Sequence, residues 1–251
     1  MFSYFLRKEI TDRYLGSSSA LLWVVAQPVA MLFVYYLVFG FIFKARVGDL
    51  PEELFITYLA VGLWPWMAFS EAVLGSLTTI INRKDLLGKV KIDLRQVLLA
   101  GVTSHFILHG IGYMTIIILL MAFDRLVPQW SLFWLILPYA ILYLFAVALA
   151  FLFSAAQVFY RDLKQIVTAF MPLWFFTTPI IYAWVLVPEA GQKVLAYNPL
   201  LPIINFIHTV TFNLSTPDFK SLLVVTTGIV IFTFITHAFF QKLAPRFDDF
   251  V

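Results

Sequence analysis

The long uncharged stretches of this sequence decide what it can fold into. Residues 20–43 contain no charged side chain, and similar apolar runs recur along the chain. A helix of about 20 apolar residues spans the roughly 30 Å hydrocarbon core of a bilayer. Of the 251 residues, 62% are hydrophobic and 12% are charged, which is far from the composition of an ordinary soluble domain. The sequence therefore predicts an all-α integral membrane protein with no separate soluble domain.

Short charged segments divide the chain into six apolar runs, and six is the simplest number of membrane crossings. We predict one membrane domain over residues 1–251, which begins with an interfacial helix at 1–19. The predicted spans are 20–43, 54–81, 96–123, 131–158, 166–187 and 221–240, with a cytoplasmic segment at 82–95 and an external broken region at 188–220.

The basic residues predict the orientation of these spans. With six crossings, most of the 17 Lys and Arg residues fall on the side of the N-terminus. Because basic residues collect in cytoplasmic segments, both termini are expected in the cytoplasm. The net charge of +3 follows from this bias and requires no nucleic-acid partner.

Motifs for nucleotide hydrolysis and metal catalysis are missing from the sequence. Neither G-x-x-x-x-G-K-[ST] nor H-E-x-x-H occurs, and there is no cysteine. We therefore expect no catalytic site, no cofactor and no metal in this chain. His105 and His109 are four residues apart and share a helix face, which permits a metal pair in principle. No third ligand is near them in sequence, so hydrogen bonds from these two side chains to a neighbouring helix are the favoured interpretation.

Glu71 is an acid in the middle of a predicted span. An acid at this depth costs roughly 2.5–3.5 kcal/mol on insertion scales, and it usually faces a partner or a water-filled cavity. One interpretation is a polar point in a substrate pathway or an ion pair across a dimer. The other is a carboxylate bonded to a nearby hydroxyl, such as that of Ser70 or a partner of the Ser76 helix. The sequence leaves both open.

Aromatic side chains are dense in two stretches. The candidates are Trp64, Trp66, Phe69, Trp174, Phe175, Phe176 and Tyr182. They either form interfacial belts at the ends of spans or line a conduit in which rings stack on sugar faces. The second stretch, PLWFFTTPIIYAW, also contains Pro179, which removes a helical hydrogen bond.

The longest charged segment between spans reads INRKDLLGKVKIDLR. Its apolar residues are spaced to form one helix face. Such a helix either lies along the membrane surface or docks into a groove of a soluble partner.

Several of these motifs together resemble a known family. They are RKEITDRYLGSSSALLWVVAQPVAMLFVYYLVFGFIF, YLAVGLWPWMAFSEAVLGS, FYRDLKQIVTAFMPLWFFTTPIIY, YNPLLPIINFIH and KLAPRFDDFV. Their order and spacing resemble the membrane permease of ABC-type polysaccharide exporters, which export O-antigen and teichoic acid. The resemblance implies a homodimer of six-span subunits in the bacterial cytoplasmic (inner) membrane, bound to two copies of a soluble ATPase that carries ATP and Mg. The implied cargo is an undecaprenyl-pyrophosphate-linked glycan.

The resemblance also implies roles for particular residues. The residues implied to couple the permease to the ATPase are Arg83, Lys84, Asp85, Leu86 and Leu87. The aromatic candidates and Glu71 are implied to line or gate the substrate path. The lipid pyrophosphate is expected to meet Arg7, Lys8 or Arg13 at the cytoplasmic entrance. Pro179 is the expected place where the fifth span stops and short re-entrant segments begin.

Two other functions compete with this one. A membrane-embedded transferase acting on a lipid-linked glycan would show several acids, or a His-Asp pair, near one membrane face. An ion-coupled transporter would need more than one acid within the membrane for a proton relay. Asp85 and Asp93 instead lie among basic residues, which suits docking or anionic lipid.

Overall fold

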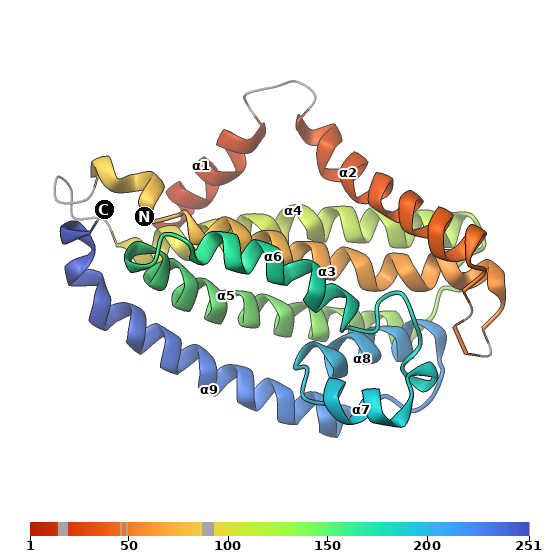
Figure 1. The fold of residues 1–251 in the computed structure, drawn as a ribbon. Coiled ribbons are helices and arrows are strands. Elements are labelled where there is room, and N and C mark those ends of the chain that lie inside the picture. The colour runs from red at the N-terminus through yellow and green to blue at the C-terminus, as the bar shows by residue number, and fades with distance from the viewer. Residues whose placement is uncertain (15–19, 46, 49, 87–92, 251) are drawn as a thin grey trace.

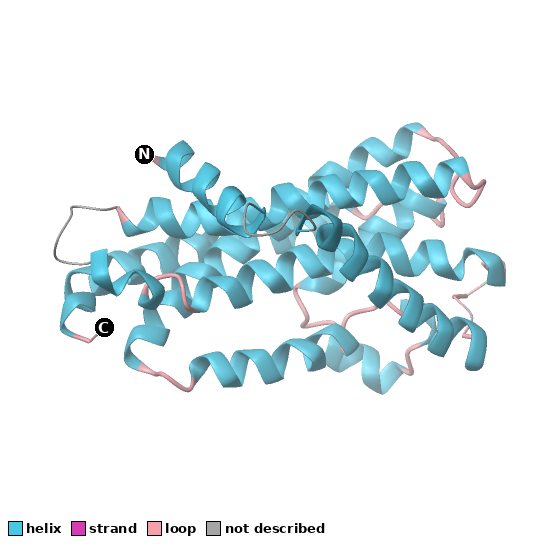
Figure 2. Cartoon of the chain, turned by 90° about the horizontal axis from the view of Figure 1, so that it is seen from above, coloured by secondary structure: helices cyan, strands magenta, loops and turns pink. Residues whose placement is uncertain are grey.

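The structure, a computed structural model, describes residues 1–14, 20–45, 47–48, 50–86 and 93–250. Within these ranges the side chains of 13–14, 20–25, 84–86 and 248 lie outside the description. Every regular element in the described chain is helical, and Figure 2 contains no strand. The expected all-α architecture is therefore confirmed for this part of the chain.

The elements follow one another without a separate domain. They are α1 (Phe2–Tyr14), α2 (Ala20–Tyr35), the π-helix η1 (Tyr36–Ile42), η2 (Glu52–Leu54), α3 (Phe55–Leu77), η3 (Ile81–Leu86), α4 (Leu94–Ala122), η4 (Trp130–Leu135), α5 (Ile136–Phe159), α6 (Leu163–Phe176), η5 (Trp184–Leu186), α7 (Glu189–Leu195), α8 (Leu200–Phe212), α9 (Phe219–Leu243) and η6 (Ala244–Asp249).

The long helices run alternately in opposite directions. Figure 1 shows α2, α4 and α6 running one way along the bundle, and α3, α5 and α9 running the other. The N- and C-terminal ends lie at the same end of the bundle in both views (Figures 1 and 2). The short helices α7 and α8 lie at the opposite end.

Three helical stretches in the described residues are long and apolar enough to cross a membrane. They are Leu94–Ala122, Trp130–Phe159 and Phe219–Phe247. The pair α7 and α8 adds a fourth if it counts as one span, although the two helices meet at an angle of 112°. Helix α3 is not among them, because Trp64, Pro65, Trp66 and Glu71 lower its mean hydropathy.

The run predicted as the fifth span, 166–187, is not a single helix. Helix α6 ends at Phe176, three residues before Pro179. Pro179 has no N–H with which to serve the carbonyl of Phe175, and that carbonyl accepts from the backbone N–H of Thr178 instead. The Thr178 hydroxyl also donates to the carbonyl of Trp174, at 2.8 Å. These bonds close the helix before the proline.

Helix α3 is the centre of the core, and it packs closely against α4. Each helix offers a glycine to a ring from the other. A Cβ added at Gly75 would lie 2.8 Å from His105 Nε2, and one added at Gly112 would lie 2.7 Å from Trp64 Nε1. Both distances are too short for a real Cβ. A glycine inside a helix costs about 0.5–1 kcal/mol relative to alanine, and here it makes room for a large side chain.

Replacing Gly112 by alanine tests this packing. We expect Gly112→Ala to destabilise the protein by about 1–3 kcal/mol, because the new methyl group collides with the buried indole of Trp64. Thermal unfolding of the detergent-purified protein measures the change. Gly101→Ala in the same helix is the matched control, since a Cβ there meets no atom within 4 Å. The control should be neutral or stabilising by up to about 1 kcal/mol, and equal effects at the two positions would contradict the packing argument.

Candidate functional site

Most of the predicted aromatic residues meet in one cluster. Trp66 and Phe69 from α3 contact Trp174 from α6, with ring centroids 6.4 and 5.6 Å away. Phe175 lies 5.7 Å from Trp66, and Phe145 of α5 stacks on Phe69 at 5.4 Å. The aromatic cluster, defined by these five residues, thus joins α3, α5 and α6.

The exposed apolar surface beside the aromatic cluster belongs to other residues of α6. Phe69 is 0% exposed, so it packs inside the chain, whereas Phe176 is 49% exposed. Phe170 and Leu173 of α6 are exposed as well. Trp64 does not join the cluster: it is buried against Gly112 on the α4 side. Trp64 is therefore separate from the aromatic cluster. The exposed aromatic side chains near the cluster, Phe170 and Phe176, lie on α6.

The backbone after α6 is not helical, yet side chains satisfy its carbonyl groups. The Tyr58 hydroxyl donates to the carbonyl of Tyr182 at 3.0 Å and lies 3.5 Å from that of Pro179. The Asn198 amide donates to the carbonyl of Thr177 at 3.1 Å. Irregular backbone within a bilayer is tolerated only where protein or a water-filled cavity covers it. These contacts meet that condition at the break.

Asn198 holds the two sides of this break together. Its side-chain oxygen accepts from Trp174 Nε1 and from the backbone N–H of Leu200, both at 3.0 Å. The hydroxyl of Tyr182 donates to the carbonyl of Phe176 at 3.1 Å. The end of α6, the turn around Pro179 and the start of α8 are therefore linked through side chains.

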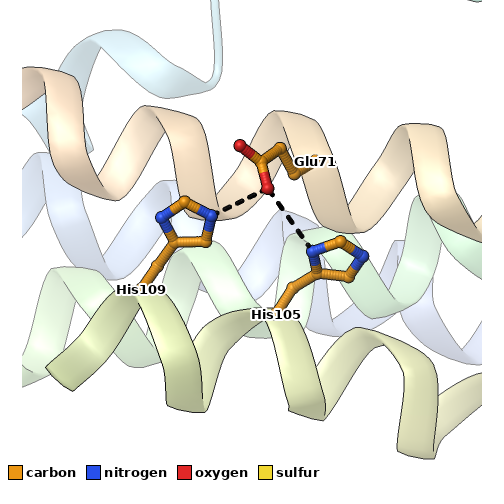
Figure 3. A group of neighbouring side chains, drawn as sticks. All are labelled: Glu71, His105 and His109. Atoms are coloured by element: carbon orange, nitrogen blue, oxygen red, sulfur yellow. Dashed lines mark hydrogen bonds and ion pairs between the residues drawn. The ribbon is translucent and has the colours of Figure 1, made fainter. Parts of the chain in front are cut away.

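Glu71 lies between the two histidines of α4 (Figure 3). Its Oε2 is 2.9 Å from His109 Nε2 and 3.7 Å from His105 Nδ1. Both histidines are buried, while the Glu71 side chain is 33% exposed. The Nδ1 of His109 is buried and has no hydrogen-bond partner among the described residues. In this part of the chain the three form the one group of at least three His, Asp or Glu side chains with ligand atoms within 4.8 Å of one another.

The Ser70 hydroxyl, one of the partners considered for Glu71, bonds elsewhere: it donates to the carbonyl of Met67 at 3.3 Å. Nothing in the sequence indicates that Glu71 and the two histidines meet. Only the register of α3 against α4 brings them together.

The predicted coupling segment begins in η3 and is fixed to α1. Arg83 interrupts the helical geometry of η3, with φ −115° and ψ 19°. Its guanidinium forms an ion pair with Glu9 of α1, and both side chains are mostly buried. The side chains of Lys84, Asp85 and Leu86 are outside the description, as is the whole of Leu87. Arg83 is thus already paired within its own chain.

Helix α1 packs on the beginning of α4. Phe5 forms a small buried cluster with Val97 and Ala100. Arg7 and Lys8 are exposed, and the side chain of Arg13 lies outside the description. The first two candidate pyrophosphate ligands therefore face away from the bundle, on the helix that carries Glu9.

Asp93 caps α4 just after the coupling segment. Its carboxylate accepts from Arg95 Nε at 2.9 Å and from the backbone N–H of Arg95 at 3.1 Å. The hydrogen bond from the Arg95 side chain is the main reason that the pKa of this carboxyl lies below its usual value. Asp93 is therefore charged at neutral pH. A negative charge at the N-cap interacts favourably with the dipole of α4.

A charge swap tests the link between α1 and η3. Arg83→Glu should lower thermal stability, because it places two carboxylates together in a mostly buried contact. Adding Glu9→Arg should restore about 1–2 kcal/mol, measured as the coupling in a double-mutant cycle. The exposed pair Arg125–Glu53 is the matched control and should show a coupling of about 0–1 kcal/mol. No recovery in the Glu9→Arg/Arg83→Glu variant would contradict the pairing.

Comparison with known proteins supplies a family resemblance. No protein-family model matches the chain. An O-antigen export system permease protein RfbA of Myxococcus xanthus is 26% identical over 246 residues, which cover 97% of this chain and 92% of that protein. Two proteins of the same name from Klebsiella pneumoniae are 26% and 28% identical, each over 96% of this chain and 91% of their own length. The resemblance that the motifs indicated is thus confirmed: nearly from end to end, this chain is similar to O-antigen export system permease proteins.

Proposed function

We propose that this chain is the membrane permease subunit of an ATP-driven exporter of an O-antigen-like polysaccharide. The observation that carries the proposal is the near-full-length similarity to three proteins named as O-antigen export permeases. The all-helical bundle of alternating apolar helices supports it. The sequence has no nucleotide-binding motif, so ATP and Mg belong to a separate ATPase subunit.

Six crossings per subunit are part of the proposal. The crossings would be α2 with η1, α3, α4, η4 with α5, α6 with the broken segment, and α9. The alternating helix directions and the common position of the two termini support an even number (Figure 1). The basic residues near both termini support a cytoplasmic location for that end, with α1 in the membrane interface and α7 and α8 as re-entrant helices on the far side.

The working assembly in this proposal is a homodimer in the bacterial cytoplasmic (inner) membrane with two ATPase subunits. The exposed face of α6 would border the conduit, since Phe170, Leu173 and Phe176 leave aromatic and apolar surface uncovered there. Behind that face, the aromatic cluster would hold α6 against α3 and α5. Movement of α6 would then open or close the path for the glycan, with Glu71 and Tyr182 as further candidates along it.

Residues 83–87 would couple the permease to the ATPase. A segment that transmits a push must be held firmly by the chain that it moves. Here the Arg83–Glu9 ion pair holds one side of the segment, and the Asp93 cap holds α4 on the other. In this arrangement Arg83 acts as an anchor, and Lys84 to Leu87 would contact the partner.

Co-expression with the ABC ATPase encoded beside this chain tests the function. We expect the ATPase to co-purify through a tag on this chain and its ATP hydrolysis to change with the permease present. Lys84→Glu should reduce co-purification by about tenfold, the effect of losing roughly 1.4 kcal/mol of interface energy. Arg83→Glu should reduce it as well, and adding Glu9→Arg should restore it, because the anchor is rebuilt.

The matched control is Lys242→Glu, a charge reversal at the end of α9 near both termini, which should leave co-purification unchanged. Failure of any ATPase to co-purify with the unmodified chain would remove the exporter function. A membrane-embedded transferase acting on a lipid-linked glycan would then become the leading alternative.

The exposed cations of α1 are proposed to receive the undecaprenyl pyrophosphate group. Arg7→Glu and Lys8→Glu should each weaken the apparent affinity for the lipid-linked substrate by about fivefold, since a basic residue near a membrane surface contributes about 1 kcal/mol toward anionic groups. The measurement is the amount of glycan that reaches the cell surface when the lipid-linked substrate is limiting. Co-purification of the ATPase checks that each variant is folded. Unchanged export in the Arg7→Glu/Lys8→Glu double variant would contradict this role.

A further inference from the structure

We propose that Glu71, His105 and His109 form a binding site for a divalent transition cation of the zinc type, between α3 and α4. The site does not depend on the proposed transport function. Nothing in the sequence groups these three side chains, and no metal was expected. The fold brings them together (Figure 3).

The spacing of the ligand atoms suits such an ion. Zinc lies about 2.0–2.1 Å from imidazole nitrogen and carboxylate oxygen, so two ligand atoms of a tetrahedral site are about 3.3 Å apart. Glu71 Oε2 lies 2.9 Å from His109 Nε2 and 3.7 Å from His105 Nδ1. These two distances bracket the required value. A small rotation of the carboxylate, the most exposed of the three groups, would even them out.

The surroundings hold the two imidazoles in place. His105 and His109 are one helical turn apart on α4, so both rings point to the same face of that helix. The His105 ring packs directly on Gly75 of α3, at a position where any Cβ would collide with its Nε2. Both histidines are buried. The two imidazoles are therefore packed in place on α4, and Glu71, the most exposed of the three side chains, has the most freedom to adjust.

The chemistry of the ligands selects the kind of ion. Two imidazoles and one carboxylate suit zinc and its neighbours, whereas magnesium and calcium prefer oxygen ligands alone. Sites with three protein ligands leave a fourth position for water or another ligand. Of the three ligands, Glu71 is the one that reaches the surface of the chain, with 33% of its side chain exposed.

A bound ion would tie α3 to α4. Glu71 comes from α3 and both histidines come from α4, so coordination would restrict sliding between these helices. The expected consequence is a protein that unfolds at a higher temperature as the zinc concentration rises.

Metal titration of the full-length protein in detergent tests the site, after treatment with a chelator. We expect about one zinc ion per chain by elemental analysis and a rise in the unfolding temperature with zinc but not with magnesium. Cobalt should give the intense visible absorption of a tetrahedral site. Glu71→Gln and His109→Asn should each weaken zinc affinity at least about 100-fold, since even loss of a residue that only supports a ligand costs 10–100-fold.

The matched control is His237→Gln, which removes a histidine that packs against Phe151 of α5, away from the cluster. This variant should bind zinc like the unmodified protein. The proposal is overturned if the unmodified protein takes up no zinc, or if Glu71→Gln and His109→Asn retain its affinity. Should either variant fail to fold, the cobalt spectrum of the unmodified protein decides: weak absorption means that no tetrahedral site exists.

Discussion

The close approach of α3 and α4 is the contact on which the rest of this bundle depends. Within lipid there is no hydrophobic force between helices, so association relies on packing and on polar contacts. The two helices exchange rings reciprocally: His105 of α4 fits over Gly75 of α3, and Trp64 of α3 fits over Gly112 of α4. This exchange fixes the helix register. The meeting of Glu71 with the histidines follows from that register.

Two of the long helices lie close to runs predicted from the sequence, because absence of charge over a run is a strong and local signal. Helix α4 begins at Leu94 and ends at Ala122, close to the predicted 96–123, and α9 contains the whole of 221–240. Composition alone did not show where α6 ends. Pro179 marked a break in the sequence, but the helix closes earlier because the N–H and hydroxyl groups of Thr178 take its last carbonyls. The residue at which α6 ends therefore depends on local hydrogen bonds.

Contacts between distant parts of the chain could not be predicted. The Arg83–Glu9 pair and the Glu71 cluster each join residues far apart in sequence, and neither pairing has a periodic signature. The aromatic candidates were divided for the same reason: Trp64 and Trp66 are two residues apart on α3, so they face different neighbours. The sequence identified which residues are unusual, whereas helix packing determined their partners.

Helix α9 is the least covered of the three membrane-length stretches. Only 17% of its most apolar segment is buried inside the chain, against 61% for the stretch that contains α5. Its 25 residues rise about 37 Å, which is long enough to cross the roughly 30 Å hydrocarbon core. Figure 1 shows α9 running obliquely to α3 and α4. Because little of α9 is covered by the rest of the chain, its inclination can change with little disturbance of the packing around it. A thinner or thicker membrane would therefore be met first by a change in the inclination of α9, with the α3–α4 contact left intact.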